Sequence, residues 1–404
     1  MYKRQDLKLP EYEPSPADEC EILDLRRWDD CLLATRGGID EVYNLAADMG
    51  GIGYITAFHA DIARNNILIN AHMLEASRQN KAKRFLFSSS ACVYAQSKQR
   101  TPEVTPLREE DAFPAEPEPG YGWEKLFAEE LCRYYQHDYK FDTRIVRFHN
   151  VYGPLGTYDG GKEKAPAAIC RKVALAGDPD EIEVWGDGEQ TRSFMYVDDC
   201  VEGLVRLMAS DCSDALNLGT DELVTINQLV DLVADVAGKR IAKRHNLQGP
   251  QGVRGRNSDN SRLREVLGWE PAITLRQGLP RTYPWIESEL RNAGAVGTCL
   301  LYTSRVMHQH YLHCKGVLSV APRNPQLYAS LVPQRHATCS LSGWFLMVNA
   351  QQRLQSDSAS THNQRARRQL LALSSPYQPR RRCAVQTRST DRSSDCLLYT
   401  SRCV

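Results

Sequence analysis

Short apolar runs alternate with amphipathic segments along the first part of the chain. The runs Glu21–Leu25, Glu41–Ala46, Arg84–Phe87 and Thr143–Arg147 predict strands, and the spacing of apolar residues predicts a helix over Asn65–Gln79. Strands that alternate with helices favour an α/β fold built on a doubly wound parallel sheet.

The pattern continues with shorter elements in the next part of the chain. Apolar periodicity predicts helices over Asn227–Ala237 and Ser261–Leu267, and glycine-rich loops occur at residues 185–194 and 252–259. Two arginines in the second loop, Arg254 and Arg256, suit a diphosphate because guanidinium groups donate pairs of hydrogen bonds to phosphate oxygens. We expect a smaller α/β substrate domain here.

Composition limits the class of protein. The chain has 404 residues, 42% of them hydrophobic, and a formal charge of zero, which suits one or two globular domains. No run of about eighteen apolar residues and no signal peptide occurs, so we expect a cytoplasmic protein that does not enter a membrane. The thirteen cysteines show no Cys-x-x-Cys spacing, and the histidines lack ligand spacing, so we expect reduced thiols and no metal.

The last part of the chain differs in composition. From Cys299 onward, thirteen Arg and one Lys face three Asp and no Glu, a net charge of +11. The peptide Cys-Leu-Leu-Tyr-Thr-Ser-Arg occurs at Cys299 and again at Cys396, and its back-translation resembles a transposon end used to tag sequencing libraries, as does that of residues 2–5. We interpret residues 1–5 as adapter-derived and residues 299–404 as an artefactual, unstructured tail, rather than as a basic segment that binds nucleic acid.

One spacing indicates a reaction. Tyr121 and Lys125 are four residues apart, so on a helix they share one face, and an ammonium beside a phenol lowers its pKa from about 10 towards neutrality. Such a tyrosinate could take a proton from a sugar hydroxyl. Ser90 follows the apolar run Arg84–Phe87, at the expected carboxyl edge of the sheet. A Tyr-Lys pair at this spacing more often lies on a solvent-exposed helix face than in a catalytic site. The serine-rich end of the preceding strand favours the catalytic interpretation here.

These residues resemble the extended short-chain dehydrogenase/reductase family, also described as NAD-dependent epimerases and dehydratases. The resemblance implies a Rossmann domain, NAD as cofactor, and hydride transfer aided by Ser90, Tyr121 and Lys125. The family's first strand is followed by a G-x-G-x-x-G turn that binds the pyrophosphate, and no such motif stands in residues 1–60. We therefore expect a truncated Rossmann domain that lacks its first strand, glycine turn and second strand, binds NAD poorly and is inactive as written.

The residues around the triad distinguish between reactions. Ala91 and Cys92 stand where the family's dehydratases carry acidic residues, which disfavours dehydration. A simple 4-epimerase needs neither the Cys92 thiol nor Lys164, and both side chains can act as acid or base when their pKa values shift towards neutrality. Cys92 could instead be a core residue and Lys164 a surface residue.

The blocks at residues 44–51, 89–92, 162–168 and 252–260 resemble the GDP-mannose 3,5-epimerases. The resemblance implies oxidation and re-reduction at C4 by the triad, proton exchange at C3 and C5 by Cys92 and Lys164, and GDP-L-galactose as product. It also implies a homodimer. The cofactor-binding residues that it implies are Asp24, Leu25, Ala46, Ala47, Tyr121 and Lys125. Those implied for GDP-mannose, or a related nucleotide-sugar, are Gly50, Asn150, Glu163, Lys164, Lys172, Gln190, Arg192 and Arg256.

Residues 6–165 would then form the truncated NAD-binding domain, and residues 166–298 mainly the nucleotide-sugar domain. The alternatives are a nucleotide-sugar 4-epimerase or dehydratase of the same family, or a relative that binds nucleotide-sugars without catalysis.

Overall fold

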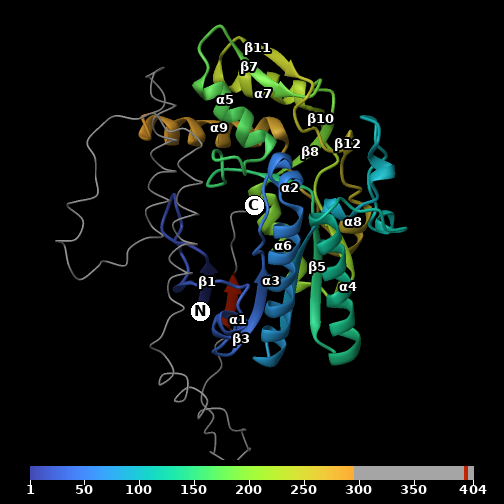
Figure 1. The fold of residues 1–404 in the computed structure, drawn as a ribbon. Helices are drawn as coiled ribbons and strands as arrows, with labels where there is room; N and C mark the ends of the chain where they lie inside the picture. The colour runs from blue at the N-terminus through green and yellow to red at the C-terminus, as the bar shows by residue number, and fades with distance from the viewer. Residues whose placement is uncertain (295–394, 399–404) are drawn as a thin grey trace, which may run out of the picture. The chain divides into compact units, whose positions relative to one another are not determined.

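The main sheet consists of seven parallel strands. In the computed structural model, which describes residues 1–294 and 395–398, their order is β2-β1-β13-β3-β4-β5-β9 (Figure 1). The strands are β1 (Tyr2–Asp6), β2 (Glu19–Ile22), β3 (Ile39–Asn44), β4 (Arg84–Ser90), β5 (Asp142–Phe148), β9 (Ala215–Leu218) and β13 (Asp395–Leu398). The predicted doubly wound α/β fold is confirmed.

Helices pack against this sheet and join its strands. Helices α3 and α4 lie side by side over β4 and β5 (Figure 1). The helices of this part are α1 (Trp28–Ala34), α2 (Ile52–Ala57), α3 (His59–Gln79), α4 (Tyr121–Tyr139), α6 (Val197–Ala209) and α8 (Ser261–Leu267). Three short 3₁₀ turns lie between β4 and α4, at Ala91–Val93, Gln96–Gln99 and Glu109–Ala112.

A second group of elements surrounds its own apolar core. Strands β10, β8 and β12 form a small sheet with β6 beside β8, and β11 pairs with β7. The elements are β6 (Asn150–Tyr152), α5 (Ala165–Leu175), β7 (Asp180–Trp185), β8 (Thr191–Tyr196), β10 (Leu223–Thr225), α7 (Ile226–Ala237), β11 (Ile241–Asn246), β12 (Gly255–Arg256) and α9 (Leu275–Asn292). Side chains of α5, α7 and α9 fill this core.

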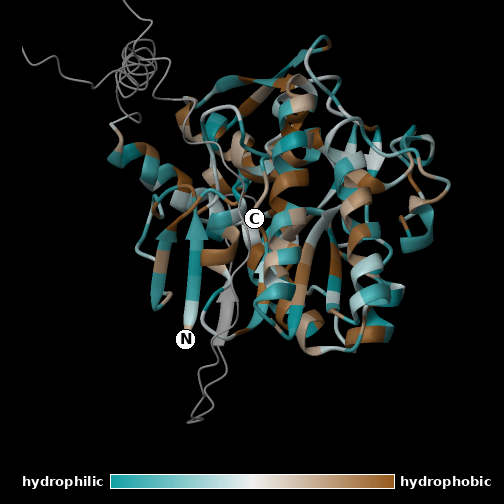
Figure 2. Ribbon diagram, turned by 60° about the horizontal axis from the view of Figure 1, so that its bottom comes forward, coloured by the Kyte–Doolittle hydropathy of each residue, from teal (hydrophilic) through white to brown (hydrophobic). Residues whose placement is uncertain are grey.

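Burial follows the predicted pattern in the centre of the main sheet. Residues Phe85–Ser89 of β4 are all buried, as expected of a strand covered on both faces. Figure 2 shows apolar residues on the central strands, whereas the two strands beside the N-terminus are largely hydrophilic. No helix of the described residues is long and apolar enough to span a membrane.

Several predicted boundaries shift, and the N-terminal edge differs most. Residues 2–6, most of which we interpreted as adapter-derived, form β1, because their backbone pairs in parallel with β2 and buries Lys3 and Gln5. The predicted tail 299–404 lies outside the described residues except for β13, whose backbone pairs with both β1 and β3. These four residues pair with two strand edges, and the interpretation of the tail as artefactual remains a prediction.

Strand β9 also shows that the two parts are not consecutive along the chain. It lies within residues 166–298, yet it pairs with β5 at the edge of the main sheet. Its residues belong to the first core together with those of α6.

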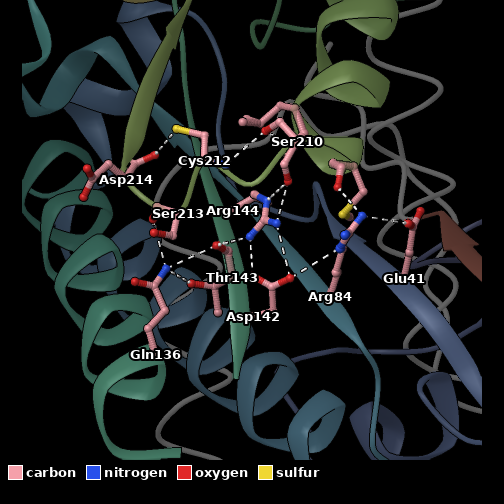
Figure 3. Close-up of polar contacts among 12 residues, drawn as sticks. Glu41, Arg84, Gln136, Asp142, Thr143, Arg144, Ser210, Cys212, Ser213 and Asp214 are labelled. Atoms are coloured by element: carbon pink, nitrogen blue, oxygen red, sulfur yellow. Dashed lines mark hydrogen bonds and ion pairs between the residues drawn. The ribbon is translucent and has the colours of Figure 1, made fainter. Parts of the chain in front are cut away.

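Two arginines bind the carboxyl end of α6 to the amino ends of β4 and β5 (Figure 3). The Arg144 side chain is 2% exposed, and its Nε and Nη2 donate to the Ser210 carbonyl at 2.9 and 2.6 Å. Arg144 also contacts the Asp142 carboxylate. Arg84 donates from Nη1 to the Met208 carbonyl at 3.0 Å. The last carbonyl groups of a helix have no backbone N–H partner within that helix. The two arginines supply hydrogen bonds to such carbonyls at the carboxyl end of α6.

Arg144→Ala should reduce the free energy of unfolding by about 2 kcal/mol, because it removes a buried guanidinium group that donates twice to the Ser210 carbonyl and contacts the half-exposed Asp142 carboxylate. Arg84→Ala, at a side chain that is 32% exposed, is the matched control and should cost about 1 kcal/mol. Urea unfolding measures both values. Equal losses would contradict the larger contribution that the buried Arg144 is expected to make.

Candidate active site

A cavity of about 310 Å³ lies at the carboxyl ends of the main-sheet strands, where it meets the second group of elements. Parallel α/β sheets place ligand sites at this edge. The cavity brings together most of the residues predicted from the sequence: Ser90, Cys92, Tyr121, Lys125, Lys164, Ala47, Gly50, Asn150, Glu163, Lys172, Gln190, Arg192 and Arg256.

Strand β4 delivers Ser90 and Cys92. The strand ends at Ser90, whose hydroxyl oxygen accepts a hydrogen bond from the Cys92 backbone N–H at 3.2 Å. The 3₁₀ turn that follows directs the chain from the sheet edge into the cavity wall. The serine and the thiol are therefore held by one short turn.

Helix α4 delivers Tyr121 and Lys125 from its first turns. Both side chains are buried, and the Lys125 ammonium donates to the Ser88 carbonyl at 2.9 Å. It lies 5.0 Å from the centre of the Phe87 ring and 5.5 Å from that of Tyr121. The Tyr121 hydroxyl donates to the Met49 sulfur at 3.7 Å, and the activation of Tyr121 by Lys125 remains a prediction. Gly122 lets the helix approach, since a Cβ there would lie 2.3 Å from the Cys92 carbonyl oxygen.

Glu124 lies between α4 and α3, beside Lys125. Its carboxylate accepts hydrogen bonds from Asn66 at 2.8 Å and Asn70 at 3.2 Å, and lies 3.8 Å from the Lys125 ammonium. Burial raises the pKa of Glu124 to about 7, although Lys125 and the two amides favour the charged form. A titratable carboxyl group is thus in contact with the predicted catalytic lysine.

Arg256 is next to the thiol. Its Nη1 donates to the Cys92 sulfur at 3.6 Å, its Nη2 to Glu118 at 2.6 Å, and its Nε to Gln99 at 2.6 Å. Burial, with the negative charge of Glu118, raises the pKa of Cys92 to about 11, although Arg256 acts in the opposite direction. The thiol therefore keeps its proton. The pKa of Cys92 was expected to shift towards neutrality, and the site shifts it upward instead.

Arg192 and Gln190 line the cavity from β8 and the loop before it. Arg192 donates to the Val253 carbonyl at 2.7 Å, and burial beside Arg256 lowers its pKa to about 10. Gln190 donates to the Trp185 carbonyl at 2.9 Å, and its buried Oε1 has no hydrogen-bond partner among residues 1–294. Asn150 donates to the Ser193 carbonyl at 3.1 Å. Two guanidinium groups close together suit a ligand that carries several negative charges.

Helix α5 and the loop before it supply the remaining lysines. Lys164 is the first residue before α5, and its ammonium makes no hydrogen bond or ion pair with the described residues. Lys172 donates to the Glu183 carbonyl at 2.7 Å, and burial lowers its pKa. Glu163 is held by Arg171 at 3.0 Å and by the Gly161 N–H at 2.7 Å. Glu163 therefore shapes the loop, whereas Lys164 is available to a ligand.

Three predicted cofactor residues do not line this cavity. Asp24 pairs with Arg26 at 2.6 Å, Leu25 is buried in the first core, and Ala46 packs against that core. Ser90, Tyr121 and Lys125 all line the cavity. The glycine turn between β3 and α2, in which Gly51 is the residue before the helix, does not have the G-x-G-x-x-G spacing that would hold a pyrophosphate.

Sequence reasoning missed Glu118, Gln99 and Ser88. Glu118 lies in a proline-rich run without periodicity, and Gln99 in a short 3₁₀ turn, so neither carried a recognisable motif. Ser88 contributes only a backbone carbonyl to Lys125, which no side-chain pattern could reveal.

The NAD dependent epimerase/dehydratase family matches residues 4–219. The chain belongs to this family. Its sequence is 48% identical to GDP-mannose 3,5-epimerase of Arabidopsis thaliana over 281 residues, covering 70% of this chain and 74% of the relative. It is 29% identical to GDP-L-fucose synthase of Escherichia coli, covering 69% and 89%. The resemblance inferred from the sequence is confirmed.

A solved structure shares the fold. It is UDP-glucose 4-epimerase of Thermotoga maritima with UDP-glucose, which superposes with a TM-score of 0.64 at 24% identity and covers 72% of this chain and 91% of that one.

Glu124→Gln should change how stability depends on pH. The pKa of Glu124 is about 7 in the folded state and about 4.3 in the unfolded state. The protonated carboxyl group therefore makes its whole contribution to stability below about pH 4, and this contribution is lost as pH rises through 7. Over this window the variant should gain about 3 kcal/mol relative to the wild type. Unfolding by urea at a series of pH values measures the difference.

Glu75→Gln is the control of opposite sign. The hydrogen bond from Arg78 lowers the pKa of Glu75 to about 2, so its contribution is present above the unfolded value and is lost as pH falls towards 2. Parallel pH curves for the wild type and Glu124→Gln would contradict the burial of an ionisable carboxyl group beside Lys125.

Proposed function

We propose that the chain converts GDP-mannose to GDP-L-galactose by inverting C3 and C5 of the hexose, with transient oxidation at C4. The observation that carries this proposal is that Cys92 and Lys164, from different elements, line the same cavity as Ser90, Tyr121 and Lys125. Identity of 48% to GDP-mannose 3,5-epimerases over most of the chain supports it.

Oxidation begins at the C4 hydroxyl. Tyr121 takes its proton and Ser90 donates a hydrogen bond to the same oxygen. The buried Lys125 ammonium stabilises the tyrosinate form of Tyr121. NAD, when bound, supplies the chemistry that accepts the C4 hydride and returns it. Tyr121 then gives its proton back to the C4 oxygen at the end of the reaction.

Proton exchange depends on the second pair. The C4 ketone acidifies the hydrogens on C3 and C5, so that one member of the Cys92–Lys164 pair can remove a proton and the other can return one on the opposite face. The carbon is then inverted, with no net gain or loss of protons. Burial and the negative charge of Glu118 keep the Cys92 thiol protonated before substrate binds, and the positive charge of Arg256 opposes them.

The remaining predicted roles complete the proposal. Arg192, Arg256 and Gln190 would hold the nucleotide-sugar, with the main sheet as the NAD-binding part and the second core as the substrate part. We also propose a cytoplasmic location, which seven unpaired cysteines among the described residues support.

We further propose a homodimer formed through α3 and α4. Ile67, Trp123, Phe127 and Tyr134 of these helices are exposed apolar or aromatic side chains, which supports a covered face in the assembled enzyme. Light scattering decides this point, since a monomeric mass would contradict it.

The function is tested by incubating the purified chain with GDP-mannose and excess NAD and identifying the products by NMR. The proposed reaction predicts GDP-L-galactose as the product. The chain as written was expected to be inactive, and product formed at excess NAD would overturn that expectation. Cys92→Ser and Lys164→Met should each reduce its formation by about 10²- to 10⁴-fold, the usual contribution of a general acid or base. Cys212→Ser, at a half-buried cysteine outside the cavity lining, is the control and should keep full activity.

Inversion at C4 alone would replace this proposal with the 4-epimerase alternative. Full activity of Cys92→Ser would contradict the role of the thiol. The expected weak binding of NAD remains a prediction, and the amount of NAD needed for activity measures it.

A further inference from the structure

Two loops from different parts of the chain meet at the wall of the cavity. The first, residues 47–53, follows β3, and the second, residues 155–164, precedes α5 and carries Lys164. The Gly51 N–H donates to the Lys162 carbonyl at 3.0 Å, and a Cβ on Gly51 would lie 2.3 Å from the Glu163 carbonyl oxygen. The loops therefore touch through their backbones, and Gly50, Gly51, Glu163 and Lys164 all line the cavity.

A side-chain contact holds the loops together. The Lys162 ammonium lies 3.1 Å from the Asp48 carboxylate and 4.0 Å from the centre of the Tyr54 ring. The Tyr54 hydroxyl donates to the same Asp48 oxygen at 2.9 Å. Lys162 thus links the loop that carries Lys164 to the opposite loop by a charge-charge contact and a cation-aromatic contact.

Asp48 continues this link to the catalytic helix. Its second carboxylate oxygen accepts from Asn65 at 2.9 Å, and its backbone N–H and carbonyl both bond the Asn66 side chain. Asn66 in turn donates to Glu124, which contacts Lys125. One residue is therefore in contact with both the Lys164 loop and the network around Lys125.

We propose that Asp48 and Lys162 are positioning residues whose ion pair fastens the Lys164 loop to the cavity wall and thereby sets Lys164 opposite Cys92. The importance of that placement rests on the proposed function, in which the two side chains exchange protons with one hexose. Lys162 is 46% exposed, so salt screens the pair.

Access of a small reagent to Cys92 tests the fastening without any substrate. The free enzyme is treated with iodoacetamide at pH 9, and alkylation of each cysteine is followed by peptide mass spectrometry. Lys162→Met keeps the stem of the side chain and removes the charge. Cys92 should react about 5- to 10-fold faster in this variant, while the half-buried Cys20 and Cys212 react at the wild-type rate.

Lys83→Met is the matched control. Lys83 pairs with Asp40 at 2.6 Å, and that carboxylate has the same 19% exposure as Asp48, but the pair lies outside the cavity lining. This variant should leave the Cys92 rate unchanged. An equal Cys92 rate in Lys162→Met and wild type would overturn the proposal.

A double-mutant cycle keeps the test decisive if one variant is unstable. Asp48→Asn and Lys162→Met should each accelerate alkylation, and the double variant should be no faster than the faster single variant, because the same contact is lost. Additive effects would contradict a direct pair. With GDP-mannose, kcat should fall at least 10-fold in Lys162→Met, since Lys164 loses its placement.

The two proposals can fail separately. Faster alkylation in a chain that does not act on GDP-mannose would preserve the fastening and remove the function. Unchanged alkylation in a chain that acts on GDP-mannose would preserve the function and remove the fastening.

Discussion

The site depends on a buried ammonium group. Lys125 is 1% exposed, and a charged group taken out of water needs hydrogen-bond and charge partners to offset its lost hydration. Here the Ser88 carbonyl, two aromatic rings and the Glu124 carboxylate surround it. The charge that should activate Tyr121 therefore requires the end of β4, the start of α4 and the amides of α3 to be correctly placed together.

A second charge arrangement lies across the cavity. Arg256 is fixed by Glu118 and Gln99 and presents its remaining donor to the Cys92 sulfur. Arg192 has a lowered pKa because of burial first and of the nearby positive charge of Arg256 second. Two positive groups close together are costly without a ligand, and a diphosphate would relieve that cost. In the proposed function, Arg256 would therefore contact both the nucleotide end of the ligand and the thiol.

Much of this could be predicted from local sequence. The helix Ser261–Leu267 has the predicted bounds, and the strand before Ser90 was expected to be buried, because apolar spacing and helix ends are local signals. The common cavity of Ser90, Cys92, Tyr121 and Lys164 followed from family resemblance. Glu118, Asp48 and Lys162 could not be predicted, since their roles depend on loops far apart in sequence. The pairing of β13 between β1 and β3 is non-local in the same way.

The central claim is that one cavity performs both redox chemistry at C4 and proton exchange at the neighbouring carbons. Incubation of the chain with GDP-mannose and NAD in heavy water, followed by NMR of the recovered sugar, tests it most directly. The account predicts deuterium at both C3 and C5, and none at C4, because the hydride returns from the cofactor. Turnover with no deuterium at either carbon would contradict it.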